Sequence, residues 1–263
     1  MRISGASVLL TGATGGIGGA LAAELAARGA KLTVSGRRAE ALDPLAERHG
    51  ARAIVADLAQ PDDVRRLAEE ASGADLLIAN AALPSSGDLL DYTPEQVERA
   101  FAVNLHAPAM LARLLAPTMV AAGRGHLAFV GSLSGKAATK SASLYSGTKF
   151  GLRGFALALR QDLHGTGVGV SVVQPGFVRD AGMFAATGAK PPAGIRTVSP
   201  RQVVAGVMRA VERDVAEINV APLELRLLGA IAGQFPGFAE RIQRGGMGEK
   251  TLRQMVAAQR SRR

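Results

Sequence analysis

Short apolar runs alternate with longer amphipathic stretches along most of the 263-residue chain. The apolar runs, which predict strands, are Ser7–Thr11, Lys31–Ser35, Ala51–Ala56, Asp75–Asn80, His126–Gly131, Val168–Gln174 and Glu217–Val220. Helical patterns lie between them, at about residues 16–28, 38–48, 61–71, 94–122, 143–164 and 200–213. Several runs are almost continuously apolar, as strands buried on both faces require. This alternation predicts an α/β fold: a doubly wound parallel sheet of about seven strands with helices on both faces.

Polar residues or a proline stand at or just after the ends of six predicted strands. They are Thr11, Arg37, Asp57, Asn80, Ser132 and Pro175. Right-handed crossovers bring the carboxyl ends of parallel strands to one edge of the sheet, and ligands bind at that edge. The sequence therefore predicts one site that all six residues adjoin.

A glycine-rich segment directly follows the first predicted strand. It reads Thr11-Gly12-Ala13-Thr14-Gly15-Gly16-Ile17-Gly18 and opens a helical pattern. Strand, glycine-rich turn and helix form the context of a dinucleotide motif, because glycines let a pyrophosphate approach the free N–H groups of the helix. A tight turn without a ligand is the alternative.

The second predicted strand ends in Arg37-Arg38, with no acid beside them. A carboxylate at this point would bind the ribose hydroxyls of NAD, whereas planar guanidinium groups suit a 2′-phosphate. The pair therefore favours NADP(H) over NAD(H), unless both arginines only begin the next helix.

Tyr145 and Lys149 are four residues apart in a helical pattern, and Ser132 follows a buried strand thirteen residues before Tyr145. Residues i and i+4 share one helix face, so the phenol and the ammonium group can converge. A nearby cation lowers the pKa of a phenol, which can then exchange a proton near neutral pH. The Ser132 hydroxyl could hold the oxygen that receives the proton. The alternative is an ordinary surface Tyr and Lys.

Together, T-G-x-x-x-G-x-G, the upstream serine and Y-x-x-x-K resemble the short-chain dehydrogenase/reductase family over roughly residues 5–222. The resemblance implies a Rossmann fold and hydride transfer between a nicotinamide and a carbonyl or secondary alcohol. It implies that Tyr145 is the acid/base and that Ser132 holds the carbonyl oxygen in place. Lys149 would lower the Tyr145 pKa and bind the nicotinamide ribose, and Asn104 would hold a relay water.

The resemblance also implies further cofactor contacts. It assigns the 2′-phosphate to Arg37 and the adenine to Asp57 and Leu58. The other implied cofactor residues lie in the segment Asn80-Ala81-Ala82 and in the turn Pro175-Gly176, with the backbone N–H of Val178. Four positions depart from the family pattern: Gly15 where a basic residue is common, Ala79, Ala82, and Arg179-Asp180 in place of a threonine.

The segment Phe177–Ser199 lacks apolar periodicity and contains several Gly and Pro residues. We interpret it as a lid over the substrate, with a disordered surface loop as the alternative. The expected substrate pocket is apolar, lined by Leu83, Leu133, Phe177, Met183 and Phe184 beside Ser132 and Tyr145. It favours a hydrophobic ketone or alcohol, unless Arg179 points inward.

Composition adds the domain organisation and the remaining expectations. The chain has no cysteine, so disulfides and thiolate metal sites are excluded, and its four histidines show no metal spacing. We expect a cytoplasmic protein without a signal peptide. The catalytic domain is predicted over residues 1–222, and residues 223–263 form a basic helical extension packed on that domain or on a partner subunit.

The net charge of +9 is concentrated at the end of the chain. Residues 241–263 carry seven Lys or Arg and one acid, Glu249. A solvated tail, a subunit contact and an anionic membrane surface remain open for this segment. We expect a homodimer or homotetramer through the helices at 94–122 and 143–164, and no nucleic-acid partner.

Three other functions fit parts of this sequence. An epimerase or dehydratase of the wider fold usually has a longer C-terminal substrate domain. A non-catalytic NADP-binding scaffold would not need the Ser132, Tyr145 and Lys149 set. Nucleic-acid binding through the tail would show strong salt dependence.

Overall fold

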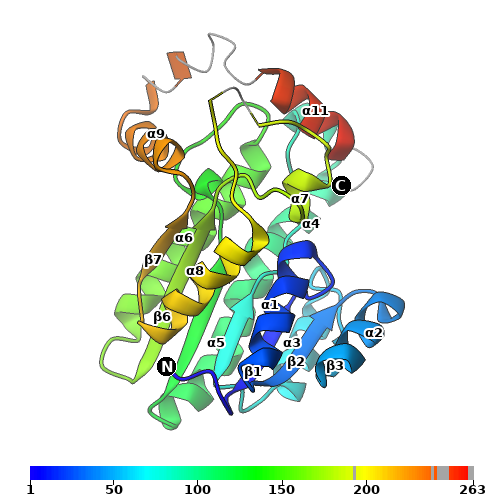
Figure 1. Cartoon of the computed structure of the whole chain (residues 1–263), viewed down its shortest axis with the longest axis vertical. Helices are drawn as coiled ribbons and strands as arrows, with labels where there is room; N and C mark the ends of the chain where they lie inside the picture. The colour runs from blue at the N-terminus through cyan, green and yellow to red at the C-terminus, as the bar shows by residue number, and fades with distance from the viewer. Residues whose placement is uncertain (192–193, 238–239, 242–248, 260–263) are drawn as a thin grey trace.

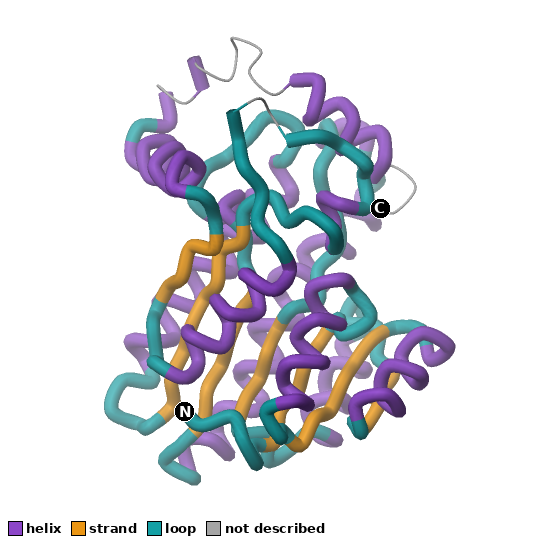
Figure 2. The backbone as a smooth tube through the Cα atoms, viewed as in Figure 1, coloured by secondary structure: helices purple, strands orange, loops and turns teal. Residues whose placement is uncertain are grey.

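The computed structural model describes residues 1–191, 194–237, 240–241 and 249–259. In this part of the chain, seven parallel strands form one sheet in the order β3-β2-β1-β4-β5-β6-β7 (Figures 1 and 2). Their bounds are β1 Ser7–Thr11, β2 Lys31–Gly36, β3 Arg52–Val55, β4 Leu76–Ala79, β5 Gly125–Val130, β6 Val168–Pro175 and β7 Glu217–Val220. The predicted doubly wound α/β fold is confirmed. The strand order reverses between β1 and β4, which opens a crevice at their carboxyl ends.

Helices cover both faces of this sheet (Figure 1). On one face the buried side chains come from α1 (Gly16–Ala27), α2 (Ala39–His49) and α8 (Pro200–Glu212). On the other face they come from α3 (Pro61–Glu70), α5 (Ala107–Ala121) and α6 (Ser143–Asp162). Both core layers are built mainly from Ala, Val, Leu and Ile, which explains how a chain with only 4% aromatic residues fills its interior.

The single helix predicted over residues 94–122 is wrong in detail, because the structure divides it into three parts. Helix α4 (Pro94–Phe101) begins at a capping box made by Thr93 and Gln96. A π-helical turn, η2 (Ala102–His106), then leads into α5. Such turns interrupt α-helices most often at functional sites, and this one contains Asn104.

Irregular segments with short helices lie at the carboxyl ends of the strands. They include η1 (Leu89–Asp91), η3 (Leu133–Gly135) and α7 (Gly182–Ala185). The segment after β6 is tied to itself by a bridge between Val178 and Val198. The segment predicted as a lid therefore contains the short helix α7, and the bridge between Val178 and Val198 joins its two ends.

Two helices of the C-terminal extension, α9 (Leu223–Gln234) and α11 (Glu249–Gln259), lie beyond the carboxyl edge of the sheet, at the top of Figure 1. Residues 242–248 and 260–263 of the predicted basic tail lie outside the described residues. In the described part, no helix combines the length and the apolarity needed to cross a membrane.

Candidate active site

A cavity of about 1830 Å³ opens at the carboxyl edge of the sheet. It is lined by almost every residue that the sequence assigned to cofactor or substrate. These are Gly12, Thr14, Gly15, Gly16, Ile17, Gly18, Arg37, Arg38, Asp57, Leu58, Asn80, Ala81, Ala82, Leu83, Ser132, Leu133, Tyr145, Lys149, Pro175, Gly176, Phe177, Val178, Met183 and Phe184. Asn104 is the exception among the residues of the predicted site.

The glycine-rich turn between β1 and α1 forms one wall of this cavity and is closely packed. A Cβ atom on Gly12, which has a φ of +66°, would lie 2.7 Å from the Ala81 Cα atom. One on Gly18 would lie 2.1 Å from the Gly12 carbonyl oxygen. Only glycine therefore allows this turn to fold against the sheet and start α1 with exposed N–H groups, as a pyrophosphate cradle requires.

Asn80, at the end of β4, holds the turn in place. Its side-chain amide donates hydrogen bonds to the carbonyl oxygens of Thr11 and Gly12, both at 3.1 Å. The Thr11 hydroxyl accepts from the amides of Asn80 and Ala81 at 3.1 and 3.2 Å. The side chain of Asn80 is thus engaged by the protein and positions the glycine turn.

Arg37 and Arg38 stand at the end of β2 on the cavity wall. Arg38 has only a distant ion-pair partner, Glu40, at 3.9 Å. Among the described residues, Arg37 has no hydrogen bond or ion pair, so its guanidinium group is available to an anion.

The Asp57 carboxylate lines the cavity and has a cationic partner. Arg99 of α4 donates to its two oxygens at 3.2 and 2.9 Å, and the Ala59 amide donates at 3.1 Å. Burial alone would raise the pKa of Asp57, but Arg99 and Ala59 outweigh it and lower the pKa. Sequence reasoning missed Arg99, which lies 42 residues further along the chain.

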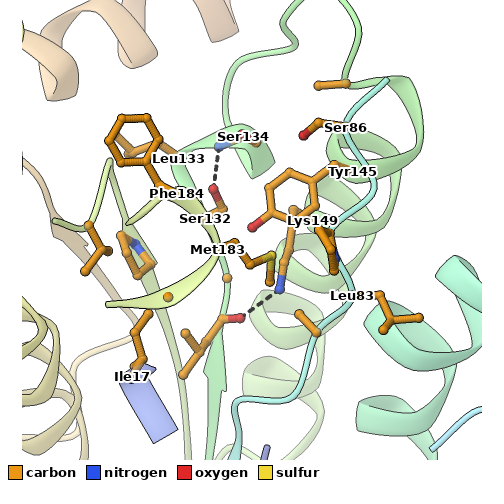
Figure 3. A pocket seen from close by; sticks show the side chains of 18 of the residues that line it. Ile17, Leu83, Ser86, Ser132, Leu133, Ser134, Tyr145, Lys149, Met183 and Phe184 are labelled. Atoms are coloured by element: carbon orange, nitrogen blue, oxygen red, sulfur yellow. Dashed lines mark hydrogen bonds between the residues drawn. The ribbon is translucent and has the colours of Figure 1, made fainter. Parts of the chain in front are cut away.

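Ser132, Tyr145 and Lys149 meet at the floor of the cavity (Figure 3). The Ser132 hydroxyl oxygen accepts a hydrogen bond from the Ser134 amide at 3.1 Å, and the side chains of Ser132 and Tyr145 are hydrogen-bonded to each other. Lys149 is buried, and its Nζ atom donates to the Val130 carbonyl oxygen at 3.0 Å. The same atom lies 5.8 Å from the centre of the Tyr145 ring.

The expected lowering of the Tyr145 pKa by Lys149 is wrong for this structure. Burial raises the pKa of Tyr145, and the hydrogen bond with Ser132 only partly opposes that effect. Burial also lowers the pKa of Lys149 to about 8. The phenol is therefore protonated at neutral pH, which is the form of a general acid.

Asn104 does not reach this group. Its side-chain oxygen accepts from the Leu83 amide at 2.6 Å, and its Nδ2 atom donates to the Leu83 carbonyl oxygen at 3.0 Å and to Ser85 at 3.4 Å. The side chain is thus fully used in holding the loop after β4. Any water relay at this residue would have to use its backbone.

The segment after β6 folds over the glycine turn. A Cβ atom on Gly16 would lie 2.5 Å from the Ala181 Cβ atom, so the two segments are in close contact. Arg179 donates to the Thr197 carbonyl oxygen at 3.0 Å and pairs with Asp180 at 3.4 Å. Neither Arg179 nor Asp180 lines the cavity. The cavity therefore keeps the apolar character expected from the sequence.

The family model for short chain dehydrogenases matches residues 6–191. The chain belongs to the short-chain dehydrogenase/reductase family. It is accordingly an oxidoreductase of that family, and the resemblance of its motifs is confirmed.

This short-chain dehydrogenase/reductase is 33% identical over 258 residues to the ketoacyl reductase HetN of Nostoc sp., an alignment that covers 92% of this chain and 89% of that protein. A short-chain dehydrogenase from Sphingobium yanoikuyae, solved in complex with NADPH, is 27% identical with a TM-score of 0.76 and 92% and 96% coverage. A metagenomic short-chain oxidoreductase in complex with NADP is 30% identical, with a TM-score of 0.71 and 84% and 99% coverage.

A buried polar network behind Ser132 is a feature of this dehydrogenase/reductase that sequence reasoning missed. The Ser132 amide donates to the Gln174 side-chain oxygen at 2.7 Å, and Gln174 donates to Glu217 at 3.2 Å. Glu217 also accepts from Arg153 at 2.7 Å and from Lys136 at 2.9 Å. Burial would raise the pKa of Glu217, but these hydrogen bonds prevail and hold it at about 2. The network fixes the loop that carries the serine.

Proposed function

We propose that this enzyme reduces a ketone on an apolar substrate with NADPH, and that Tyr145 donates the proton to the carbonyl oxygen. The observation that carries the proposal is the protonated Tyr145 phenol hydrogen-bonded to Ser132, on the floor of a largely apolar cavity. The reverse oxidation would use the same groups, with the phenolate as the base.

The cavity has the features that NADP(H) requires. Gly12, Gly16 and Gly18 would form the phosphate cradle, and the Arg37 guanidinium, which lines the same cavity, would bind the 2′-phosphate. Two related structures that carry NADPH or NADP support this cofactor. When bound, the nicotinamide supplies a hydride to the carbonyl carbon.

The protein groups supply the proton and the orientation. Ser132 donates its hydroxyl hydrogen to the carbonyl oxygen and holds it beside the phenol. Tyr145 then transfers its proton to that oxygen as negative charge develops there. Lys149, with a pKa of about 8, is mostly protonated at neutral pH and stabilises the phenolate that remains.

An apolar substrate is supported by the far end of the cavity. Phe177 and Phe184 contact each other, with ring centres 4.8 Å apart, and Met183 and Leu133 line the space nearby. No carboxylate-binding arginine lines that end among the described residues. The ketoacyl reductase relative is consistent with an acyl chain as one substrate of this kind.

A homodimer through α4, α5 and α6 is part of the proposal. These helices expose Phe101, Leu114 and Phe150, which are 38–40% accessible. Exposed apolar side chains on neighbouring helices suit a subunit interface.

The experiment is to measure loss of NADPH absorbance with a panel of ketones that share one reactive group and differ in chain length. We expect kcat/KM to rise as the apolar part grows, and NADH to be a poorer donor than NADPH. A preference for short, charged ketones would contradict the substrate class, and no turnover of any carbonyl would contradict the reaction.

A further inference from the structure

Helix α9 has an exposed apolar stripe that nothing in the described part of the chain covers. Leu223, Leu227, Ile231 and Phe235 are 60%, 55%, 44% and 64% accessible. They are spaced four residues apart, so they form one stripe along the helix and its C-terminal cap. A helix this apolar is normally buried, yet in α9 only Gly229 is.

The opposite side of α9 belongs to the active-site cavity. Leu225, Leu228, Gly229 and Ala232 line the cavity, and Ile231, at the boundary of the stripe, lines it as well. A Cβ atom on Gly176, in the turn after β6, would lie 3.3 Å from a Leu225 methyl group. The helix is therefore a thin wall between the cavity and the exterior, with apolar side chains on both sides. Core packing explains the inner side but leaves the outer stripe unexplained.

The unpaired charge on α9 and the net charge of the sequence that follows it are positive. The acid of α9, Glu224, is held in an ion pair with Arg196 at 3.0 Å, and the exposed face of the helix carries Arg226. In the sequence, residues 241–263 then carry seven Lys or Arg against one acid, a net charge of +6. An apolar stripe followed in the sequence by a cationic segment is complementary to an anionic bilayer, whose headgroups attract the cations while its acyl region receives the apolar side chains.

We propose that α9 docks on an anionic membrane surface, with Leu223, Leu227 and Phe235 inserted at the level of the headgroups. The position of the helix supports this: α9 follows β7, at the edge of the sheet where the cavity opens (Figure 1). Docking places the apolar end of the cavity next to the bilayer, which is the source of a lipophilic substrate. Membrane binding itself does not rest on the proposed reaction.

The chain contains no tryptophan, so a single introduced tryptophan reports on its own position. We would add vesicles of phosphatidylcholine and phosphatidylglycerol to full-length Phe235→Trp protein and record its fluorescence. A matched control is Val120→Trp, because Val120 is also exposed but precedes the start of β5, at the opposite edge of the sheet. We expect a blue shift and quenching by brominated lipid for Trp at 235, and neither at 120.

A second measurement uses sedimentation with the same vesicles. The triple variant Leu223→Gln, Leu227→Gln and Phe235→Gln changes only residues that do not line the cavity. It should reduce the bound fraction of the otherwise unmodified chain by at least about tenfold, since each substitution removes the transfer free energy of a large apolar side chain. Pure phosphatidylcholine and high salt should also weaken binding. Circular dichroism and NADPH turnover of a soluble ketone report separately whether the variant is folded and active.

Three results would overturn the proposal. Vesicles that leave the spectrum of Trp at 235 unchanged would show that the stripe does not insert. Binding that the triple variant retains would assign it to the basic residues alone. A self-association that the triple variant abolishes, without any vesicle binding, would show that a second copy of the chain covers the stripe.

Discussion

The backbone amide of Ser132 donates its hydrogen bond to the side chain of Gln174, at 2.7 Å, rather than to a neighbouring strand. This bond joins the candidate catalytic loop to a residue at the end of β6 that is fully buried. Glu217 then holds Gln174 from the next strand, at 3.2 Å. The orientation of the serine thus depends on side chains that never touch the substrate.

Gln174→Met keeps the size of the side chain and removes its polar groups. We expect a loss of about 1–3 kcal/mol in the free energy of unfolding, because the Ser132 amide and Glu217 lose a buried partner. We also expect kcat to fall about tenfold from misplacement of Ser132, with a smaller change in the KM for NADPH. Urea unfolding and steady-state kinetics measure the two effects.

Ser171→Ala is the matched control, since Ser171 is buried on the same strand and donates to the Val215 carbonyl oxygen at 2.6 Å, away from the cavity. It should lower stability with little effect on kcat. Equal losses of kcat in both variants would show that Gln174 acts only through general stability.

Arg37→Ala tests the assignment of the 2′-phosphate. We expect the KM for NADPH to rise about tenfold to a hundredfold and the KM for NADH to change little, because a hydrogen bond to a charged group contributes about 1.5–3 kcal/mol. Arg38→Ala should have a smaller effect. If Arg38→Ala discriminated between the cofactors more strongly than Arg37→Ala, the two roles would have to be exchanged.

The buried side chain of His126 should make the stability of the protein depend on pH. It is buried, its Nε2 atom lies 2.9 Å from the Ser171 hydroxyl, and Asp214, Arg160 and the N-terminal amine act on it electrostatically. Burial lowers the pKa of His126 from 6.5 to about 4, and Asp214 only partly opposes this. The unfolded chain therefore binds the proton first as the pH falls.

The free energy of unfolding therefore decreases as the pH falls. The stabilising contribution of neutral His126 is complete above pH 6.5 and is lost as the pH falls from 6.5 to about 4, a change of about 3 kcal/mol. Urea unfolding across this range should show the decline, and His126→Gln should flatten it. A wild-type stability that stays constant down to pH 4 would contradict the buried neutral histidine.

The apolar pattern predicted the sheet well because each strand is a local signal. Ser7–Thr11 and Glu217–Val220 agree with the structure at both ends, and the other five strands differ by one residue at one or both ends. The turn at 102–106 was missed because it is helical like the segments on both sides of it and contains no Gly or Pro to mark a break. The predicted site residues share one edge of the sheet because they follow the carboxyl ends of parallel strands, and those ends lie together.

Relations between distant side chains could not be predicted in this way. Nothing local links Gln174 to Glu217, or Asp57 to Arg99, because each pair forms only when the elements pack. The pKa of Tyr145 was expected to fall because spacing reveals the Lys149 cation but not the degree of burial, which proved the larger effect. Similarly, α9 carries apolar residues both on its cavity side and on its exposed side, so its sequence could not show which side faces the cavity.

The most direct test of the account is NADPH-dependent ketone reduction by Tyr145→Phe. This substitution removes the phenol oxygen and keeps the ring, and NADPH titration would verify that the variant still binds the nucleotide. We predict that kcat falls by about 100- to 10,000-fold, the usual contribution of a positioned general acid. A variant that binds NADPH and keeps a kcat close to that of the wild type would contradict the assignment of Tyr145 as the proton donor.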